Sequence, residues 1–197
     1  MNTGAFLEVI LHMVNGCELQ FIEQKEDRAK EILKNVNPQK FFTDKHLVIS
    51  DDSSTTRVLL DAVSSATFNT SVAFNWNFPS HIEDAMVLSK DRFLQAIDSE
   101  LEKPGVIADP GQRTRPVSLF LELLMHDGSK WYLRIFAETL KPMERIELAK
   151  IVSALTGFHA IKPEGGAVLF NMKNVVARTT YPTAMLSPQN EWKINRA

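Results

Sequence analysis

Residues 118–136 read SLFLELLMHDGSKWYLRIF, two apolar runs on either side of Asp127-Gly128. An Asp-Gly pair supplies the positive φ angles of a tight two-residue turn, so the stretch predicts a β-hairpin. Apolar side chains alternate along both runs, as they do in a strand with one buried face. They are Leu119, Leu121, Leu123 and Met125 before the turn, and Trp131, Leu133 and Ile135 after it.

A similar hairpin is predicted near the start of the chain. Residues 6–22 read FLEVILHMVNGCELQFI, with Asn15-Gly16 as the turn pair. Glu8 interrupts the first apolar run and no basic residue precedes that run, so we expect a strand and not a signal peptide.

A helix and two more strands are expected after this first hairpin. Residues 28–36 place four apolar side chains on one helical stripe, Ala29, Ile32, Leu33 and Val36. Asn37-Pro38 ends this helix, because the residue before a proline disfavours helical backbone. Residues 47–49 and 57–63 are strand-like and are separated by a turn rich in Ser, Thr and Asp. The predicted order is β-β-α-β-β.

The second hairpin is followed by the same predicted order. Pro142 suits the start of a helix, and Gly157 is a candidate for its C-cap. Residues 158–161 are a short strand, 163–166 a turn and 167–177 the last strand. The buried face of the predicted helix is Ile146, Ala149, Val152 and Leu155.

The two hairpins align at an offset of 112 residues when Asn15-Gly16 is placed on Asp127-Gly128. The same offset aligns apolar positions as far as the last strand: Leu7 with Leu119, Leu11 with Leu123, Met13 with Met125, Leu60 with Met172 and Val63 with Val175. We therefore predict an α+β fold built by internal duplication, with two related β-β-α-β-β units whose antiparallel sheets are each covered by a helix. Residues 6–68 and 118–180 are predicted to superpose, with the helix on the same face. The alternative is that two unrelated halves share a common order of elements.

The predicted organisation is a first unit over residues 1–76, a partly helical insert over 77–116 and a second unit with a C-terminal tail over 117–197. Residues 72–76 are expected to extend the first sheet. In the insert, Ser80 and Glu83 have the spacing of a capping box that would begin a helical piece. Ser89 is expected to cap a further helix that buries Phe93, Ile97 and Leu101. Residues 103–116 are rich in Pro and Gly and predict a loop, either mobile or functional.

Composition limits the class of protein. The chain has 197 residues, of which 44% are hydrophobic, enough for a core. No run approaches eighteen apolar residues, so no membrane span is predicted. Cys17 is the single cysteine, which excludes an internal disulfide and a cysteine-based zinc site and favours a reducing, cytoplasmic setting.

The charge of the chain is distributed unevenly. Residues 1–112 hold 10 Lys and Arg against 17 Asp and Glu, whereas residues 113–197 hold 12 against 7. Bulk charge does not indicate a nucleic-acid-binding protein. A basic face in the C-terminal half nevertheless predicts contact with an acidic partner there.

No catalytic, cofactor or metal motif emerges, and no catalytic residue, cofactor or metal ligand is predicted. The five histidines, among them His12 and His126, lack the helical i, i+4 spacing of a metalloprotease site. Asp51-Asp52 lacks the spacing of a calcium loop, and Gly165-Gly166 precedes a strand where a phosphate loop would precede a helix. Cys17 is expected near a turn, with no base in the sequence assigned to activate it.

One set of basic residues is worth testing: Arg113, Arg115, Lys130, Arg134, Lys173 and Arg178. Trp131 and Tyr132 interleave with them, a mixture that single-strand binders use for stacking and phosphate contact. The simpler interpretation is that Trp131 packs inside its hairpin and the charges only maintain a polar surface.

The function expected is that of a non-catalytic interaction or regulatory protein. Its partner is expected to be an acidic protein that contacts the second unit through Arg113, Arg115, Lys173 and Arg178. Contact between copies of the chain would satisfy the same charge asymmetry. A nucleic-acid-binding module is the alternative, and a small-ligand-binding protein or enzyme with a site between the units is a further one. A flat apolar patch favours the first, a basic surface with exposed aromatics the second, and a polar pocket between the units the third.

Overall fold

The computed structural model describes residues 4–50, 53–79, 82–101, 115–139 and 144–181. The strands are β1 (Leu7–Met13), β2 (Glu18–Glu23), β3 (His46–Ser50), β4 (Thr55–Leu59), β5 (Val63–Thr70), β6 (Asp84–Leu88), β7 (Arg115–Met125), β8 (Lys130–Thr139), β9 (Gly157–Ile161), β10 (Ala167–Asn171) and β11 (Val175–Tyr181). The helices are α1 (Glu26–Asn35), α2 (Lys90–Leu101) and α3 (Glu144–Ala154), with 3-10 turns η1 (Leu60–Ala62) and η2 (Met172–Asn174).

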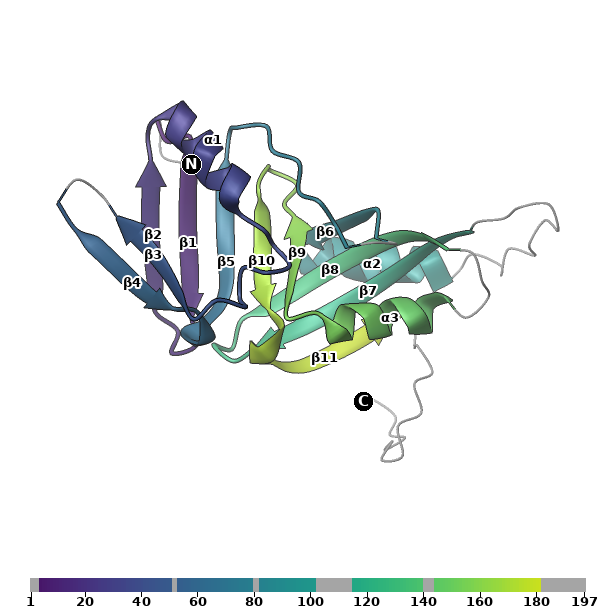
Figure 1. Cartoon of the computed structure of the whole chain (residues 1–197). Helices are drawn as coiled ribbons and strands as arrows, with labels where there is room; N and C mark the ends of the chain where they lie inside the picture. Colours follow the sequence, from purple (N-terminus) through teal and green to yellow (C-terminus); the bar gives the residue numbers. More distant parts are fainter. Residues whose placement is uncertain (1–3, 51–52, 80–81, 102–114, 140–143, 182–197) are drawn as a thin grey trace.

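Nine of these strands form one sheet in the order β11-β7-β8-β6-β9-β10-β5-β1-β2, and β3 pairs with β4 in a separate sheet (Figure 1). The fold is therefore mixed, with a large, mostly antiparallel sheet and few helices. The expectation of two sheets, one for each unit, is wrong in this respect. Strand β5 of the first half pairs with β10 of the second, from Phe68 opposite Ala167 to Ser65 opposite Phe170, and this pairing joins the halves.

Both predicted hairpins are present, but their turns are one residue longer than expected. The Gly16 N–H donates to the Met13 carbonyl at 2.9 Å, and the Gly128 N–H donates to the Met125 carbonyl at 3.0 Å. Each loop therefore has three residues and closes on a glycine in the left-handed region, with φ of 82° and 84°. The side chains of Asn15 and Asp127 accept the N–H two residues on, at 3.0 and 2.8 Å, and hold the turns.

The last strand predicted for each unit is two strands. Residues 57–63 are interrupted by η1 and residues 167–177 by η2, so each half has one strand more than the expected β-β-α-β-β order. Apolar periodicity conceals the break, because Leu60 within η1 is itself buried, at 2% exposure. At the second break the Asn171 side chain accepts the Lys173 N–H at 3.2 Å and begins the turn.

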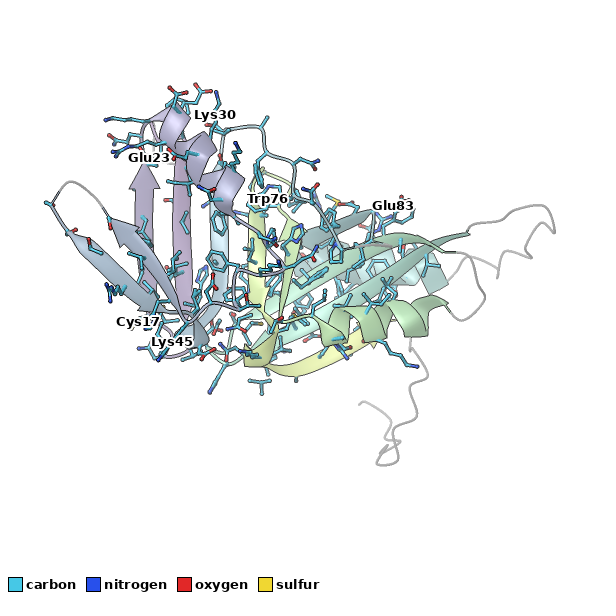
Figure 2. The ribbon with its side chains drawn as sticks, in the orientation of Figure 1. Cys17, Glu23, Lys30, Lys45, Trp76 and Glu83 are labelled. Atoms are coloured by element: carbon cyan, nitrogen blue, oxygen red, sulfur yellow. The ribbon has the colours of Figure 1, made fainter. Side chains whose placement is uncertain are left out.

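The insert also differs from the expectation. The helical piece expected near Ser80 and Glu83 is not supported, because a strand, β6, begins at Asp84. Glu83 donates its N–H to the Phe136 carbonyl at 3.0 Å and so belongs to the sheet, while Ser80 lies outside the described residues. Residues 72–76 form no strand, although Trp76 is buried over the central strands (Figure 2).

The helix predicted after Ser89 is confirmed as α2. The Ser89 hydroxyl accepts the Arg92 N–H at 3.4 Å, and Phe93 and Ile97 are buried. The expected loop is described only at its end, where Arg115 and Pro116 already belong to β7 and residues 102–114 lie outside the described part.

The helix predicted in the second half is α3, and it buries Ala149 and Val152 as expected, together with Leu148. Pro142 is not described, nor is the Ile146 side chain. Gly157 is not a C-cap, because it begins β9. A Cβ at this position would lie 2.8 Å from the Pro38 carbonyl oxygen, so glycine here allows a close approach of two backbones.

Three clusters of buried apolar side chains hold these layers together. The first core cluster packs α1 against β1 and β5 and includes Leu7, Leu11, Ala29, Leu33, Phe68, Ala167 and Leu169. The second packs α3 against β7 and β8 and includes Leu119, Leu121, Leu133, Val152, Phe158, Val168 and Phe170. The third packs α2 behind β7 and includes Phe93, Ile97 and Phe120 (Figure 1). Strand β10 contributes to the first two clusters and is buried on both faces.

Backbone pairing repeats between the halves at the offset of 112. Leu7 lies opposite Glu23 and Leu119 opposite Ile135, while Val9 lies opposite Phe68 and Leu121 opposite Thr180. A register shift occurs at corresponding places in the β1–β5 and β7–β11 pairs. The helices do not keep this offset, since α1 begins at Glu26 and α3 at Glu144.

Among the described residues, no helix is both long enough and apolar enough to cross a membrane.

Candidate functional site

Exposed large apolar side chains gather on the first half of the molecule. Ile22 on β2 is 44% exposed, Val48 on β3 54% and Leu59 on β4 43%. Leu19 on β2 and Ile32 on α1 are also exposed, and in the described part of the chain only Leu94 and Val176 share this property elsewhere. We call Ile22, Val48 and Leu59 together the apolar edge, which is extended: Ile22 adjoins Glu23 at one end of the first half, and Leu59 pairs with His46, next to Lys45, at the other (Figure 2).

Strand β2 is an end of the nine-stranded sheet. The Met13 N–H donates to the Cys17 carbonyl at 2.8 Å, and this bond fixes which residues of β2 bond to β1. Because antiparallel pairing alternates, Leu19 and Phe21 direct their backbone groups toward β1, whereas Gln20 and Ile22 direct theirs away from it. Among the described strands, β3 pairs only with β4. Two strand edges therefore border the apolar edge.

A polar network crosses the sheet near this region. The Glu8 carboxylate, 8% exposed, accepts hydrogen bonds from the side-chain amides of Gln20 and Asn69, the latter at 2.7 Å. Asn69 accepts from Lys162 at 2.7 Å, and Lys162 pairs with Glu164 at 2.8 Å. The hydrogen bond from Asn69 is the main cause that lowers the pKa of Glu8, against the opposing effect of burial. The carboxylate is thus held charged and satisfied, which fits a structural role.

His159 is the buried histidine that sequence reasoning did not single out. It is 1% exposed, stacks on Phe78 with ring centroids 4.4 Å apart, and lies 6.2 Å from Trp76. Burial lowers its pKa to about 4, and the Trp76 backbone opposes this shift. No hydrogen bond of ordinary geometry reaches either ring nitrogen from the described residues. A neutral imidazole among aromatic rings is a core residue, and only its tertiary surroundings could reveal this.

His12 is held between a hydroxyl group and a carboxylate group. The two ring nitrogens of His12 are engaged, Nε2 with the Thr67 hydroxyl at 3.1 Å and Nδ1 with Glu18 at 3.0 Å. Cys17 is exposed at the turn of the first hairpin (Figure 2). In the part of the chain that the structure describes, no group of three or more His, Cys, Asp or Glu is placed to hold a metal ion.

The predicted partner-binding residues are only partly described. Arg113 lies outside the described residues, and Arg115 begins β7 with its side chain undescribed. The Nζ of Lys173 in η2 lies 3.5 Å from an Asp61 carboxylate oxygen, so this charge already forms an ion pair within the chain. Arg178 is exposed on β11, opposite Leu123.

Trp131 and Tyr132, the aromatic residues considered for stacking on bases, are both engaged in packing. The Trp131 ring lies 5.4 Å from Phe170, and its Nε1 donates to the Ser129 hydroxyl at 3.2 Å. Tyr132 lies 5.1 Å from Phe93 in the third cluster. Both side chains are partly buried, and these contacts occupy part of each ring.

A surface cavity of about 490 Å³ lies in the first half and not between the two units. Residues 34–39, Phe74, Asn75 and Asn77 line it. Lys34 is the one ionisable side chain in this lining, which otherwise offers amides and apolar groups. The cavity can therefore donate and accept hydrogen bonds, but its lining holds no acid–base pair.

Comparison of the chain with protein-family models, with curated proteins and with solved structures finds no match.

Proposed function

We propose that this chain is a non-catalytic interaction protein that acts through protein–protein contacts. The observation that carries the proposal is the apolar edge, Ile22, Val48 and Leu59, which is 43–54% exposed and borders two strand edges. These side chains are spread along two open strand edges, and exposed apolar residues beside open strand edges favour binding of another protein chain.

The chemistry of the candidate sites supports binding over catalysis. The cavity is lined by one ionisable group, Lys34, and the buried carboxylate Glu8 is held by Gln20 and Asn69. General acid–base catalysis needs a titratable group within hydrogen-bond reach of a bound substrate. The described cavity offers only a lysine for that purpose.

We also propose that the halves are duplicated units, over residues 6–68 and 118–180. The repeated pairing registers and the repeated register shift support this origin. Helix α1 packs in one cluster with Leu7 and Leu11, and α3 packs in one with their counterparts Leu119 and Leu123. This packing supports the proposal that the helices lie on corresponding faces of the two units.

An acidic partner at the second unit remains part of the proposal, with Arg113, Arg115, Lys173 and Arg178 as its contacts. Its support is the excess of Lys and Arg over Asp and Glu after residue 112. Such contacts would weaken as salt screens exposed charges, whereas contacts at the apolar edge would not.

Affinity capture from native lysate, with and without nuclease, tests the function. Val48→Arg and Leu59→Arg should each remove the captured proteins, because a charge would be placed in an apolar contact. Leu94→Arg, which introduces the same charge at an exposed apolar residue on α2, should leave capture intact. Equal capture by all three variants, or capture that depends on nucleic acid, would count against the proposal.

A further inference from the structure

Strand β6 fills a position in the second half that has a counterpart in the first. It runs antiparallel to β8, with Val87 opposite Leu133 and Met86 opposite Arg134. It also runs parallel to β9, where Met86 lies opposite Ile161. Strand β6 therefore links the outer edge of the β7–β8 hairpin to the outer edge of the β9–β10 hairpin.

The counterparts of β8 and β9 are β2 and β3. Strand β8 corresponds to β2 at the offset of 112, and β9 corresponds to β3 at 111, because the loop after β9 is one residue longer. Both hairpins are anchored alike, with the Leu60 N–H on the Lys45 carbonyl at 3.1 Å and the Met172 N–H on the Thr156 carbonyl at 3.0 Å. In the described part of the first half, no strand links these two edges.

Side chains beside β6 are more deeply buried than their counterparts in the first half. Next to β6, Leu133 is 0% exposed, Phe158 1% and Ala160 0%. Their counterparts Phe21, Leu47 and Ile49 are only partly buried, although they pack against the first core cluster. On the other face, His159 is 1% exposed and its counterpart Val48 is 54% exposed. Leu133, Phe158 and Ala160 are thus buried beside β6, whereas their counterparts are more exposed; His159 is covered by Phe78, and its counterpart Val48 has no such cover among the described residues.

We infer that β2 and β3 accept an extended segment of a partner protein as an added strand, antiparallel to β2 and parallel to β3. The inference rests on the proposed interaction function and on the repeated register of the two halves. The outward backbone groups of Gln20 and Ile22 supply the main-chain hydrogen bonds.

The side chains around the two edges define the segment that fits. The residue in the place of Val87 faces Phe21 and the first core cluster, so a β-branched residue suits it. The residue in the place of Met86 lies on the other face, near Ile22 and Val48, and should also be apolar. The partner segment is therefore extended and apolar on both faces over about three residues, as is expected of a strand buried on both sides.

The chain itself supplies the probe. An acetylated and amidated peptide of residues 83–89, EDAMVLS, carries the sequence of β6. Titrated into the full-length labelled chain, it should shift the methyl resonances of Ile22 and Val48 saturably and slow amide exchange at Gln20 and Ile22. The peptide EDDMDLS, which places charges at both inward positions, should have no effect.

A matched pair of variants separates backbone pairing from side-chain loss. Gln20→Ala and Gln20→Pro both lose the amide that donates to Glu8, but only Gln20→Pro loses the outward N–H. An edge strand tolerates proline at a position whose N–H faces solvent. Gln20→Pro should weaken peptide binding at least tenfold relative to Gln20→Ala, with dispersed spectra in both variants showing that they fold.

The inference is wrong if the peptide causes no saturable shift, or if the two Gln20 variants bind it equally. It is also wrong if the shifts are confined to Arg134 and His159, because the peptide would then be displacing β6. Protection of Gln20 that increases with protein concentration alone would mean that a second copy of the chain occupies the site. The capture experiment distinguishes failure of the proposed interaction function from failure of the inferred strand addition. If Val48→Arg abolishes capture while Gln20→Pro does not, the interaction function stands and strand addition is wrong.

Discussion

His159 couples the stability of the fold to pH through a single side chain. Its pKa in the folded chain is about 4, against an ordinary value of 6.5, because it is buried among aromatic rings. In the unfolded chain His159 therefore becomes protonated as the pH falls below 6.5, whereas in the folded chain it becomes protonated only near pH 4. The stability that the neutral ring contributes is present above pH 6.5 and is lost as pH falls toward 4, by roughly 3 kcal/mol for a shift of this size.

Replacing the ring by a non-titrating one should remove this loss. His159→Phe should show a smaller decline in the free energy of unfolding between pH 6.5 and 4 than the unchanged chain. Urea unfolding at a series of pH values measures it, with His126→Gln, a change at an exposed histidine, as the control. An unchanged pH profile in His159→Phe would show that the imidazole is not the group responsible.

At the scale of elements, two glycines distinguish the energetic cost of left-handed backbone from the cost of a steric clash with a neighbouring strand. Gly16 and Gly166 both have positive φ, of 82° and 80°. A Cβ on Gly16 would meet nothing within 4 Å, whereas a Cβ on Gly166 would lie 1.9 Å from the Phe68 carbonyl oxygen on β5. The turn between β9 and β10 therefore sits directly against the neighbouring strand.

Alanine at the two positions should have unequal effects. Gly16→Ala should cost about 1 kcal/mol of unfolding free energy, which is the expense of left-handed backbone alone. Gly166→Ala should cost at least twice that, because β5 and β10 must also move apart. If chemical denaturation shows equal losses of unfolding free energy in the two variants, the turn at Gly166 accommodates the Cβ without a shift of β5 or β10.

Local patterns predicted the elements whose signals are local. The hairpins at Asn15-Gly16 and Asp127-Gly128 follow from alternation and turn residues a few positions apart, and α2 follows from Ser89 and the helical spacing of Phe93 and Ile97. The breaks at η1 and η2 were missed, because Leu60 and Met172 continue an apolar run through a change of direction. Strand β6 was missed because its five residues resemble a strand only once β8 and β9 lie on either side.

The candidate site could not be predicted from the sequence for a related reason. Ile22 and Val48 look like ordinary strand residues, and their exposure depends on whether another strand reaches them. The basic residues selected from charge were visible in the sequence, but the pairing of Lys173 with Asp61 joins positions more than a hundred residues apart. Edges and ion pairs of this kind are properties of the tertiary fold.

At the scale of the whole molecule, the repeated register identifies the strand pairing through which two copies of the chain would associate. Where β5 joins β10, Ala66 lies opposite Leu169, and both are fully buried. A head-to-tail contact between two copies would join β11 to β4 in the same way. The counterparts of Ala66 and Leu169 in that contact are Arg178 and Arg57, two like charges directly opposed. A charged edge of this kind opposes further strand pairing.

Removing these charges should therefore promote self-association. The double variant Arg57→Leu with Arg178→Ala restores the residue pair of the β5–β10 junction and should form larger species as protein concentration rises. Arg57→Lys with Arg178→Lys keeps the charges and should behave as the unchanged chain does. Sedimentation velocity distinguishes the two, and a double variant that sediments like the unchanged chain would refute the role given to the arginines.

The junction between β5 and β10 also bears on how the chain is made. Strand β5 ends at Thr70 and its partner begins at Ala167, so roughly a hundred residues must be synthesised between them. At about 5–20 residues per second, a ribosome takes on the order of 5–20 s to supply the missing strand. Throughout that interval Ala66 and Phe68, fully buried in the finished fold, stand on an open edge. The nascent first half should thus be a client of chaperones until the second half emerges to cover it.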